Sequence, residues 1–277
     1  MGRTLGEGDN GGVYRAILKL DGAGNMCTVG LKTKKRHRNK IWREFMGGFL
    51  FIVTRKAGIE LPSLIPTWGM VIDNKHPHSM TVGTNISYPF IVGVVMPIRE
   101  FKTLKEVKKS QELTNLIPKT PLGIAKMMLP AAEAFLFMER VHLSNQDMDG
   151  NNIGAPTPSS QYQGAFVFDY TFLSFLKGTT CSLHMMNQSN GCNFCDKKFL
   201  TQEHRDRGDG QERSNDCSIF GKILRNMLDM ITPREEDVQS WELLLEHYFH
   251  KEECRFEDIV ASLRNATAGG LKALIVD

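Results

Sequence analysis

Four glycines within seven residues, in the segment LGEGDNGGVYRA (5–16), constrain the fold of this 277-residue chain more than any other feature. Gly6, Gly8 and Gly11 form the pattern G-x-G-x-x-G, which is typical of loops whose bare main chain approaches a phosphate. In a dinucleotide-binding fold this pattern follows a strand and begins a helix. Here five residues precede Gly6, and the residues after Gly11 alternate in polarity as a strand does. The glycines therefore join two strands, and a flexible hairpin without a ligand is the competing interpretation.

The chain changes character near residue 98, from strands and turns to helices. The turn signal DGAG (21–24) predicts a hairpin, and one helix is predicted over 41–57 although Gly47 and Gly48 weaken it. Apolar and β-branched runs predict strands over 11–20, 26–33, 67–73 and 88–98. Helical periodicity predicts helices over 121–142, 217–231, 238–249 and 256–265, the first kinked by Pro130. A long polar loop is predicted over 177–215.

Composition and charge exclude several classes of protein. The net charge of +3 is too small to argue for a nucleic-acid partner. The most apolar run, 88–98, is about half of the roughly 20 residues that cross a bilayer, and the N-terminus has no signal-peptide pattern. We therefore expect a soluble, intracellular protein without a membrane partner. The basic run KKRHRNK, from Lys34 to Lys40, is a nuclear localisation signal, a nucleic-acid contact or a solvated loop.

A lysine and a single carboxylate follow the glycine hairpin, at a spacing shorter than kinases usually show. The segment VGLK (29–32) places Lys32 on the strand that returns from the hairpin, in a pattern close to V-A-I-K. Between Lys32 and Glu60 the only acidic residue is Glu44, which falls on the predicted helix. By elimination, Glu44 is the expected ion-pair partner of Lys32.

Acidic and amide side chains then recur in two short segments of the second part of the chain. NQDMDGNNIG (145–154) follows a long predicted helix and contains Asp147 and Asn152, five residues apart. Seventeen residues after Asn152, the apolar strand in FVFDYT delivers Asp169. Phosphoryl transfer needs fixed cations to neutralise the charge on the γ-phosphate and a carboxylate to orient the attacking hydroxyl. These residue types match that need.

Taken in order over residues 5–224, these motifs resemble those of the protein kinase superfamily, and NDCSIFGKIL (215–224) resembles the helix start beneath the kinase catalytic loop. The resemblance implies an α+β, bilobal fold. Residues 1–98 would form an N-lobe with a small antiparallel β-sheet and one helix, and residues 99–277 a mainly helical C-lobe. It also implies ATP and Mg²⁺ as cofactors and Ser/Thr hydroxyls of proteins as substrates.

The resemblance assigns a role to each candidate residue. Lys32, held by Glu44, would contact the α- and β-phosphates, and Asp147 would be the catalytic base. Asn152 and Asp169 would hold Mg²⁺, and Asp216 would brace the catalytic loop from the start of its helix. The expected nucleotide contacts are Gly6, Glu7, Gly8, Asp9, Asn10, Gly11, Val13, Lys32 and Met96.

Several positions depart from the kinase pattern. Asn145 and Gln146 replace the His-Arg pair of the catalytic loop, Asp149 stands where a lysine is usual, and Thr171 replaces a glycine. No Ala-Pro-Glu precedes Asp216. A lysine-free catalytic loop is most similar to the divergent Ser/Thr protein kinases of herpesviruses and other large DNA viruses. The departures keep two alternatives open, a pseudokinase that binds nucleotide or acts as a scaffold and a small-molecule phosphotransferase.

A set of potential zinc ligands lies in the predicted long loop. Cys181, His184, Cys192 and Cys195 form the pattern C-x₂-H followed by C-x₂-C. The residue types suit a tetrahedral structural Zn²⁺, although the gap between the two pairs is short for such a site. Loop cysteines without a metal are the alternative.

Overall fold

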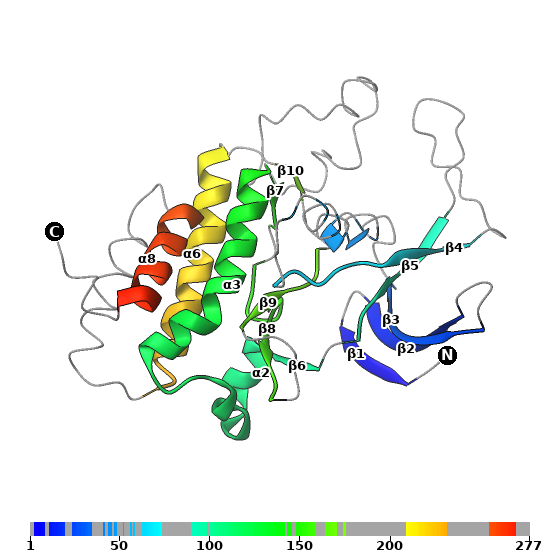
Figure 1. Ribbon diagram of the computed structural model, residues 1–277, viewed down its shortest axis with the longest axis horizontal. Helices are drawn as coiled ribbons and strands as arrows, with labels where there is room; N and C mark the ends of the chain where they lie inside the picture. Colours follow the sequence, from blue (N-terminus) through cyan, green and yellow to red (C-terminus); the bar gives the residue numbers. More distant parts are fainter. Residues whose placement is uncertain are drawn as a thin grey trace.

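The computed structural model describes residues 3–8, 11–19, 24–34, 63–73, 90–98, 100–141, 143–145, 148–158, 164–170, 174–175, 209–231 and 255–269, with single positions between 41 and 58. Within these ranges the protein is a mixed α+β structure (Figure 1). An antiparallel sheet built from the first part of the chain lies on the right of that view, and three long helices lie on the left.

The large sheet has five strands in the order β1-β2-β3-β5-β4, and every neighbouring pair is antiparallel. Its strands are β1 (Thr4–Gly8), β2 (Gly11–Lys19), β3 (Met26–Lys34), β4 (Gly69–Asp73) and β5 (Phe90–Met96). The glycine hairpin joins β1 to β2, with Gly8 opposite Gly11. The register of β2 with β3 places Val13 opposite Lys32. The predicted strand–glycine–strand arrangement is thus confirmed.

The predicted helix over 41–57 has helical backbone at the positions that are described, among them Ile41, Glu44, Gly47 and Gly48. Ile41 and Val94 of β5 are both buried and pack together, so the apolar face of this segment lies against the sheet.

The helical layer forms the main hydrophobic core. Helix α3 (Pro121–Arg140) packs against α6 (Asp209–Leu228) and α8 (Phe256–Gly269). Phe135, Phe220 and Phe256 contribute one ring from each helix, with centroids 5.2–5.8 Å apart. Helix α3 alone among the described helices is long and apolar enough to cross a membrane, but most of its surface is buried in this core. It is therefore a core helix.

Helix boundaries follow local chemistry. The Thr120 hydroxyl caps α3 by accepting the Gly123 N–H, and Pro121 occupies the first turn, where its missing N–H costs nothing. Helix α3 continues through Pro130. Residues 209–215, predicted to be loop, form the first turns of α6. Their Gln, Glu and Arg are good helix formers, and an acidic residue at the N-terminus favours the helix dipole.

Short elements connect the sheet to the helical layer. They are β6 (Phe101–Thr103), α2 (Leu104–Lys109), η2 (Gln111–Leu116), β7 (Leu143–Ser144), β8 (Ile153–Pro156), β9 (Phe166–Val167) and β10 (Ser174–Phe175). Strands β6, β8 and β9 form an antiparallel sheet, and β7 pairs with β10. Of these strands the sequence predicted only the FVF segment of β9. The predicted helix over 238–249 lies outside the described residues.

Candidate functional site

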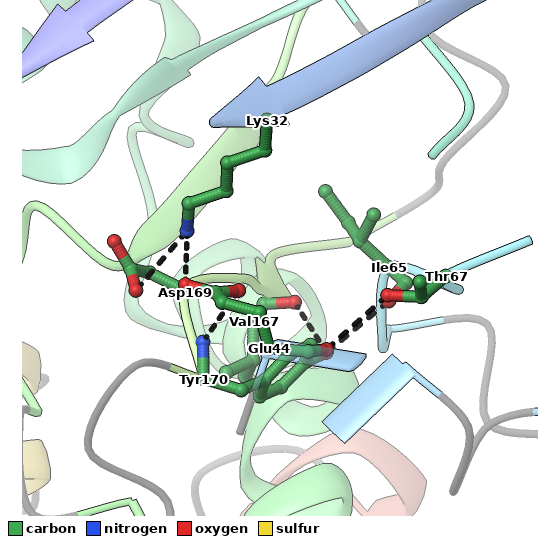
Figure 2. A network of polar contacts seen from close by, with 7 residues as sticks. All are labelled: Lys32, Glu44, Ile65, Thr67, Val167, Asp169 and Tyr170. Carbon is green, nitrogen blue, oxygen red and sulfur yellow. Dashed lines mark hydrogen bonds and ion pairs between the residues drawn. The ribbon is translucent and has the colours of Figure 1, made fainter. Parts of the chain in front are cut away.

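Lys32 lies at the centre of a cluster of three charged side chains from distant parts of the chain (Figure 2). Its ammonium projects from β3 and forms ion pairs with Glu44 Oε1 and with Asp169 Oδ1, the latter at 3.1 Å. The Lys32 and Glu44 side chains are 12% and 2% exposed, whereas Asp169 is 28% exposed. The ion pair with Glu44, which was predicted by elimination, is present in the structure, and Asp169 joins the same cluster.

Main-chain and hydroxyl groups fix the position of Glu44. The Tyr170 N–H donates to Glu44 Oε2 at 3.2 Å, so both carboxylate oxygens have a partner. The Thr67 hydroxyl donates to the Glu44 main-chain oxygen at 3.2 Å. Close approach requires the two glycines that follow, because a Cβ on Gly47 would overlap the Tyr170 side chain and one on Gly48 would overlap Thr67.

The turn that carries Asp169 has an unusual backbone. Asp169 has a φ of 64°, and it is the only residue other than glycine with a positive φ in the described part of the chain. Aspartate tolerates this left-handed conformation better than most residues, yet the conformation costs free energy and is concentrated at functional sites. The Tyr170 hydroxyl donates to the Val167 main-chain oxygen at 3.2 Å, which stabilises the turn around Asp169.

The electrostatics of the cluster favour a charged lysine and a further cation. Burial by itself lowers the pKa of the Lys32 ammonium, but the charges and hydrogen bonds of Glu44 and Asp169 outweigh it, so the pKa is raised above its ordinary value. One ammonium and two ionised carboxylates leave a net charge of −1. A divalent cation beside Asp169 would compensate this charge.

Asn152 comes close to the Asp169 turn through the main chain. Its carbonyl oxygen accepts the Phe168 N–H at 3.1 Å, and its side chain is largely buried. One carboxylate and one amide oxygen fit Mg²⁺, which uses one or two protein ligands and completes its shell with phosphates and water. Among the described residues no three His, Cys, Asp or Glu side chains gather into a metal site.

The face of the large sheet that carries the Lys32 side chain extends to the neighbouring strand β5. Gly30 lies two residues before Lys32 and opposite Met96, so it shares that face. A Cβ on Gly30 would lie 3.2 Å from Met96 Cγ and 3.5 Å from Val13 Cγ1. Val13 and Met96, both predicted nucleotide contacts, therefore converge over Gly30.

Asp216 lies in α6, beside the segment that precedes the predicted catalytic loop. The Ser144 hydroxyl donates to Asp216 Oδ2 at 2.6 Å, and both residues are buried. The prediction that Asp216 begins its helix is wrong, because α6 starts at Asp209 and Asp216 follows seven residues later. Neighbouring Asn145 is 1% exposed, and neither its Nδ2 nor its Oδ1 has a hydrogen-bond partner among the described residues.

Asp149, which departs from the kinase pattern, has cationic and amide partners. The Lys105 ammonium of α2 lies 3.4 Å from Asp149 Oδ2, and Asn151 Nδ2 donates to the same oxygen at 2.7 Å. Both side chains of the ion pair are about half exposed. The Asp149 charge is thus partly offset by a lysine that sequence reasoning did not single out.

Several predicted site residues lie outside the described part of the chain. They are Asp9, Asn10, Gln146, Asp147, Cys181, His184, Cys192, Cys195 and the basic run after Lys34. The predicted site residues that the structure does describe lie mainly in three places. These are the glycine hairpin, the cluster around Lys32 and the Ser144–Asp216 contact. Sequence reasoning noted an aromatic residue after Asp169 but gave Tyr170 no role, and it did not single out Thr67.

Comparison of the sequence with protein-family models gives no match. Comparison with curated proteins gives none either. The functional argument therefore depends on the residues and their geometry.

Proposed function

We propose that this chain is an ATP-dependent protein kinase that transfers the γ-phosphate to Ser or Thr hydroxyls of proteins. In this proposal the large sheet and the helix around Glu44 are the N-lobe, and residues 99–277 are the C-lobe. One observation carries the proposal: the Lys32 ammonium contacts both Glu44 and Asp169, which lie 12 and 137 positions away in the sequence. Within the superfamily, the lysine-free catalytic loop supports a resemblance to the divergent Ser/Thr kinases of herpesviruses and other large DNA viruses.

In the proposed mechanism each residue acts on charge or position. Lys32 donates to the α- and β-phosphates while Glu44 fixes its ammonium, and the glycine hairpin places main-chain N–H groups over the phosphates. Asp169 and Asn152 would hold Mg²⁺, which when bound neutralises charge on the phosphates. Asp147 would accept the proton of the attacking hydroxyl. The Ser144–Asp216 hydrogen bond positions the start of the segment that carries Asp147.

A phosphate-transfer assay tests this proposal. Labelled phosphate from ATP and Mg²⁺ would be followed into a generic basic protein for the wild type, Lys32→Met and Asp147→Ala. Removing the ammonium or the base should reduce incorporation by about a hundredfold or more. Lys19→Met, at an exposed position on β2, is the matched control and should leave incorporation unchanged. Equal incorporation by wild type and both site variants would reject the proposal.

A nucleotide-binding module without transfer activity is the second candidate. Asn145 favours it, because a buried amide with no partner among the described residues stands where kinases have the histidine of the catalytic loop. Thermal unfolding with and without ATP and Mg²⁺ distinguishes the two, since ligand at about 100 times its Kd adds about 2.7 kcal/mol to the unfolding free energy. Stabilisation by nucleotide together with no transfer would favour the second candidate.

Cellular location is a further part of the proposal. The basic run from Lys34 to Lys40 would act as a nuclear localisation signal. Fusing this run to a fluorescent protein and imaging the fusion tests it.

A further inference from the structure

Helix α2 lies beside β8 and is attached to the turn that directly precedes this strand, residues 149–152 (Figure 1). The Lys105 N–H donates to the Gly150 main-chain oxygen at 3.1 Å, and the Lys105 ammonium lies 3.4 Å from Asp149 Oδ2. A Cβ on Gly150 would lie 3.4 Å from Lys105 N, so the turn is in van der Waals contact with the helix. Lys105 therefore holds the 149–152 turn through both its main chain and its side chain.

The 149–152 turn is also joined to the charged cluster around Lys32. The Asn152 N–H donates to the Asp149 main-chain oxygen at 2.9 Å, which closes the turn. The Asn152 main-chain oxygen accepts the Phe168 N–H at 3.1 Å, and Phe168 directly precedes Asp169, which pairs with Lys32. A continuous series of contacts thus connects Asp149 with the cluster.

A negative charge at position 149 is unfavourable for the proposed reaction. In the sequence Asp149 lies between Asp147 and Asn152, the proposed base and metal ligand, where the kinase pattern has a lysine. A carboxylate there would repel the phosphates, whereas a lysine would attract them. The charge of Asp149 must therefore be compensated if this turn is to serve phosphate transfer.

The compensating charge lies on another element of the fold. The Lys105 ammonium and Asn151 Nδ2 both contact Asp149 Oδ2, the amide at 2.7 Å. The Asp149 and Lys105 side chains are about half exposed, and an ion pair so open to solvent contributes little to folding. Its removal should therefore change the charge of the turn more than the stability of the protein.

We propose that Lys105 is a positioning residue of the proposed kinase, which supplies from α2 the positive charge that the catalytic loop lacks at position 149. This inference rests on the proposed function and adds a residue to the same site. Lys105 acts through Asp149: it holds the carboxylate and offsets its charge, so that phosphates can approach Asn152.

Removing the ammonium would leave the Asp149 carboxylate uncompensated. We expect Lys105→Met to lower kcat by about tenfold or more, because an unpaired charge near the transferred phosphate opposes the negative charge gathered there. Lys105→Arg keeps the charge and should keep most of the activity. Lys109→Met, at an exposed position in the last turn of α2, is the matched control and should leave kcat unchanged.

A second substitution at Asp149 separates an effect of charge from an effect of attachment. In Lys105→Met the harmful group is the unpaired carboxylate, so adding Asp149→Asn should restore most of the wild-type kcat. Adding Asp149→Lys instead places a lysine at the kinase position and should restore kcat as well. If Lys105 only attached α2 to the turn, neither second substitution would help. Failure of both double variants to recover would therefore overturn the inference.

Transfer of labelled phosphate from Mg²⁺-ATP to a generic basic protein gives kcat and KM for the full chain and each variant. An unchanged kcat with a changed KM for the protein substrate would mean that Lys105 contacts that substrate, and the inference would be wrong. Urea unfolding of the same variants should give midpoints close to that of the wild type. A lower midpoint that parallels the loss of kcat would assign Lys105 a structural role and overturn the inference.

The outcomes distinguish failure of this inference from failure of the proposed function. If the wild type transfers phosphate and Lys105→Met transfers it at the same rate, the inference is wrong and the kinase proposal stands. If the wild type transfers no phosphate, the proposed function fails and the inference fails with it.

Discussion

Replacing Gly48 with alanine should destabilise this protein, although the same change in an ordinary helix stabilises it. Gly48 has helical backbone, and exchanging glycine for alanine inside a helix contributes about 1 kcal/mol to stability. The structure opposes this gain, because a Cβ at Gly48 would overlap the Oγ1, Cβ and main-chain N of Thr67. The sign of the effect therefore depends on whether Thr67 can move.

The segment around Thr67 is held on both sides. The Trp68 N–H donates to the Val95 main-chain oxygen at 2.7 Å, and the Ile65 N–H donates to that of Val167 at 3.3 Å. Because the obstructing atoms include the main chain, a rotamer change of Thr67 cannot relieve the overlap. Overpacking of this kind costs about 1–3 kcal/mol, and the upper end applies here. Subtracting the helix gain leaves a net loss of about 2 kcal/mol.

Urea unfolding followed by circular dichroism measures this loss. For a chain of this size, about 2 kcal/mol corresponds to a decrease in Tm of about 4–8 °C. Gly69→Ala is the control, since a Cβ at Gly69 meets no atom within 4 Å. Its free energy of unfolding should stay within about 0.5 kcal/mol of that of the wild type. A Gly48→Ala protein as stable as the wild type, with an unchanged m-value, would refute the close approach of the Glu44 helix to Thr67.

Three further predictions concern buried polar groups. In urea unfolding, Glu44→Gln should lower the free energy of unfolding by about 2–4 kcal/mol, and Asp169→Asn should lower it by less because Asp169 is more exposed. The control Glu257→Gln, at an exposed ion pair, should lower it by less than about 1 kcal/mol. Because folding raises the pKa of Lys32 above its ordinary 10.5, its pairing stabilises the fold fully below that pH and less as pH rises through the folded pKa. In Lys32→Met the free energy of unfolding should therefore fall less steeply as pH rises above 10.5. A fall as steep as that of the wild type would contradict this prediction. Asn145→Leu removes a buried amide that has no partner in the described part of the chain, and it should raise the unfolding free energy by about 1–3 kcal/mol. A lower urea midpoint would show that the amide is paired in solution.

Sequence reasoning predicted the parts of the site that depend on local order. The glycine hairpin, Lys32 on the returning strand and Glu44 on the next helix follow from patterns within about forty residues. Asp169 was predicted from an apolar strand that ends in an acidic residue. Its contact with Lys32 depends on tertiary packing, and the kinase resemblance supplied the expectation that the two converge.

The residues that hold the site together could not be predicted in the same way. Tyr170 contributes a main-chain N–H to Glu44, and any residue except proline has that group. Short strands such as β6 and β8 have three or four residues, too few for a periodic pattern to be distinguished from loop. From the sequence, Gly47 and Gly48 were interpreted only as residues that weaken a helix. Their close contacts with Tyr170 and Thr67 arise only after the chain folds, so the sequence could not reveal why glycine is needed there.

The two carboxylates that share Lys32 differ in burial, so they would have different roles in the proposed phosphate transfer. Glu44 is 2% exposed and accepts a second hydrogen bond from Tyr170, so moving it would leave a buried charge without its partners. Asp169 is 28% exposed, lies 3.1 Å from the ammonium and can exchange Lys32 for a cation at lower cost. Phosphate binding would therefore draw Lys32 away from Asp169 while Glu44 stays in place. In the proposed kinase, that difference in burial would give Glu44 the positioning role and Asp169 the role of metal ligand.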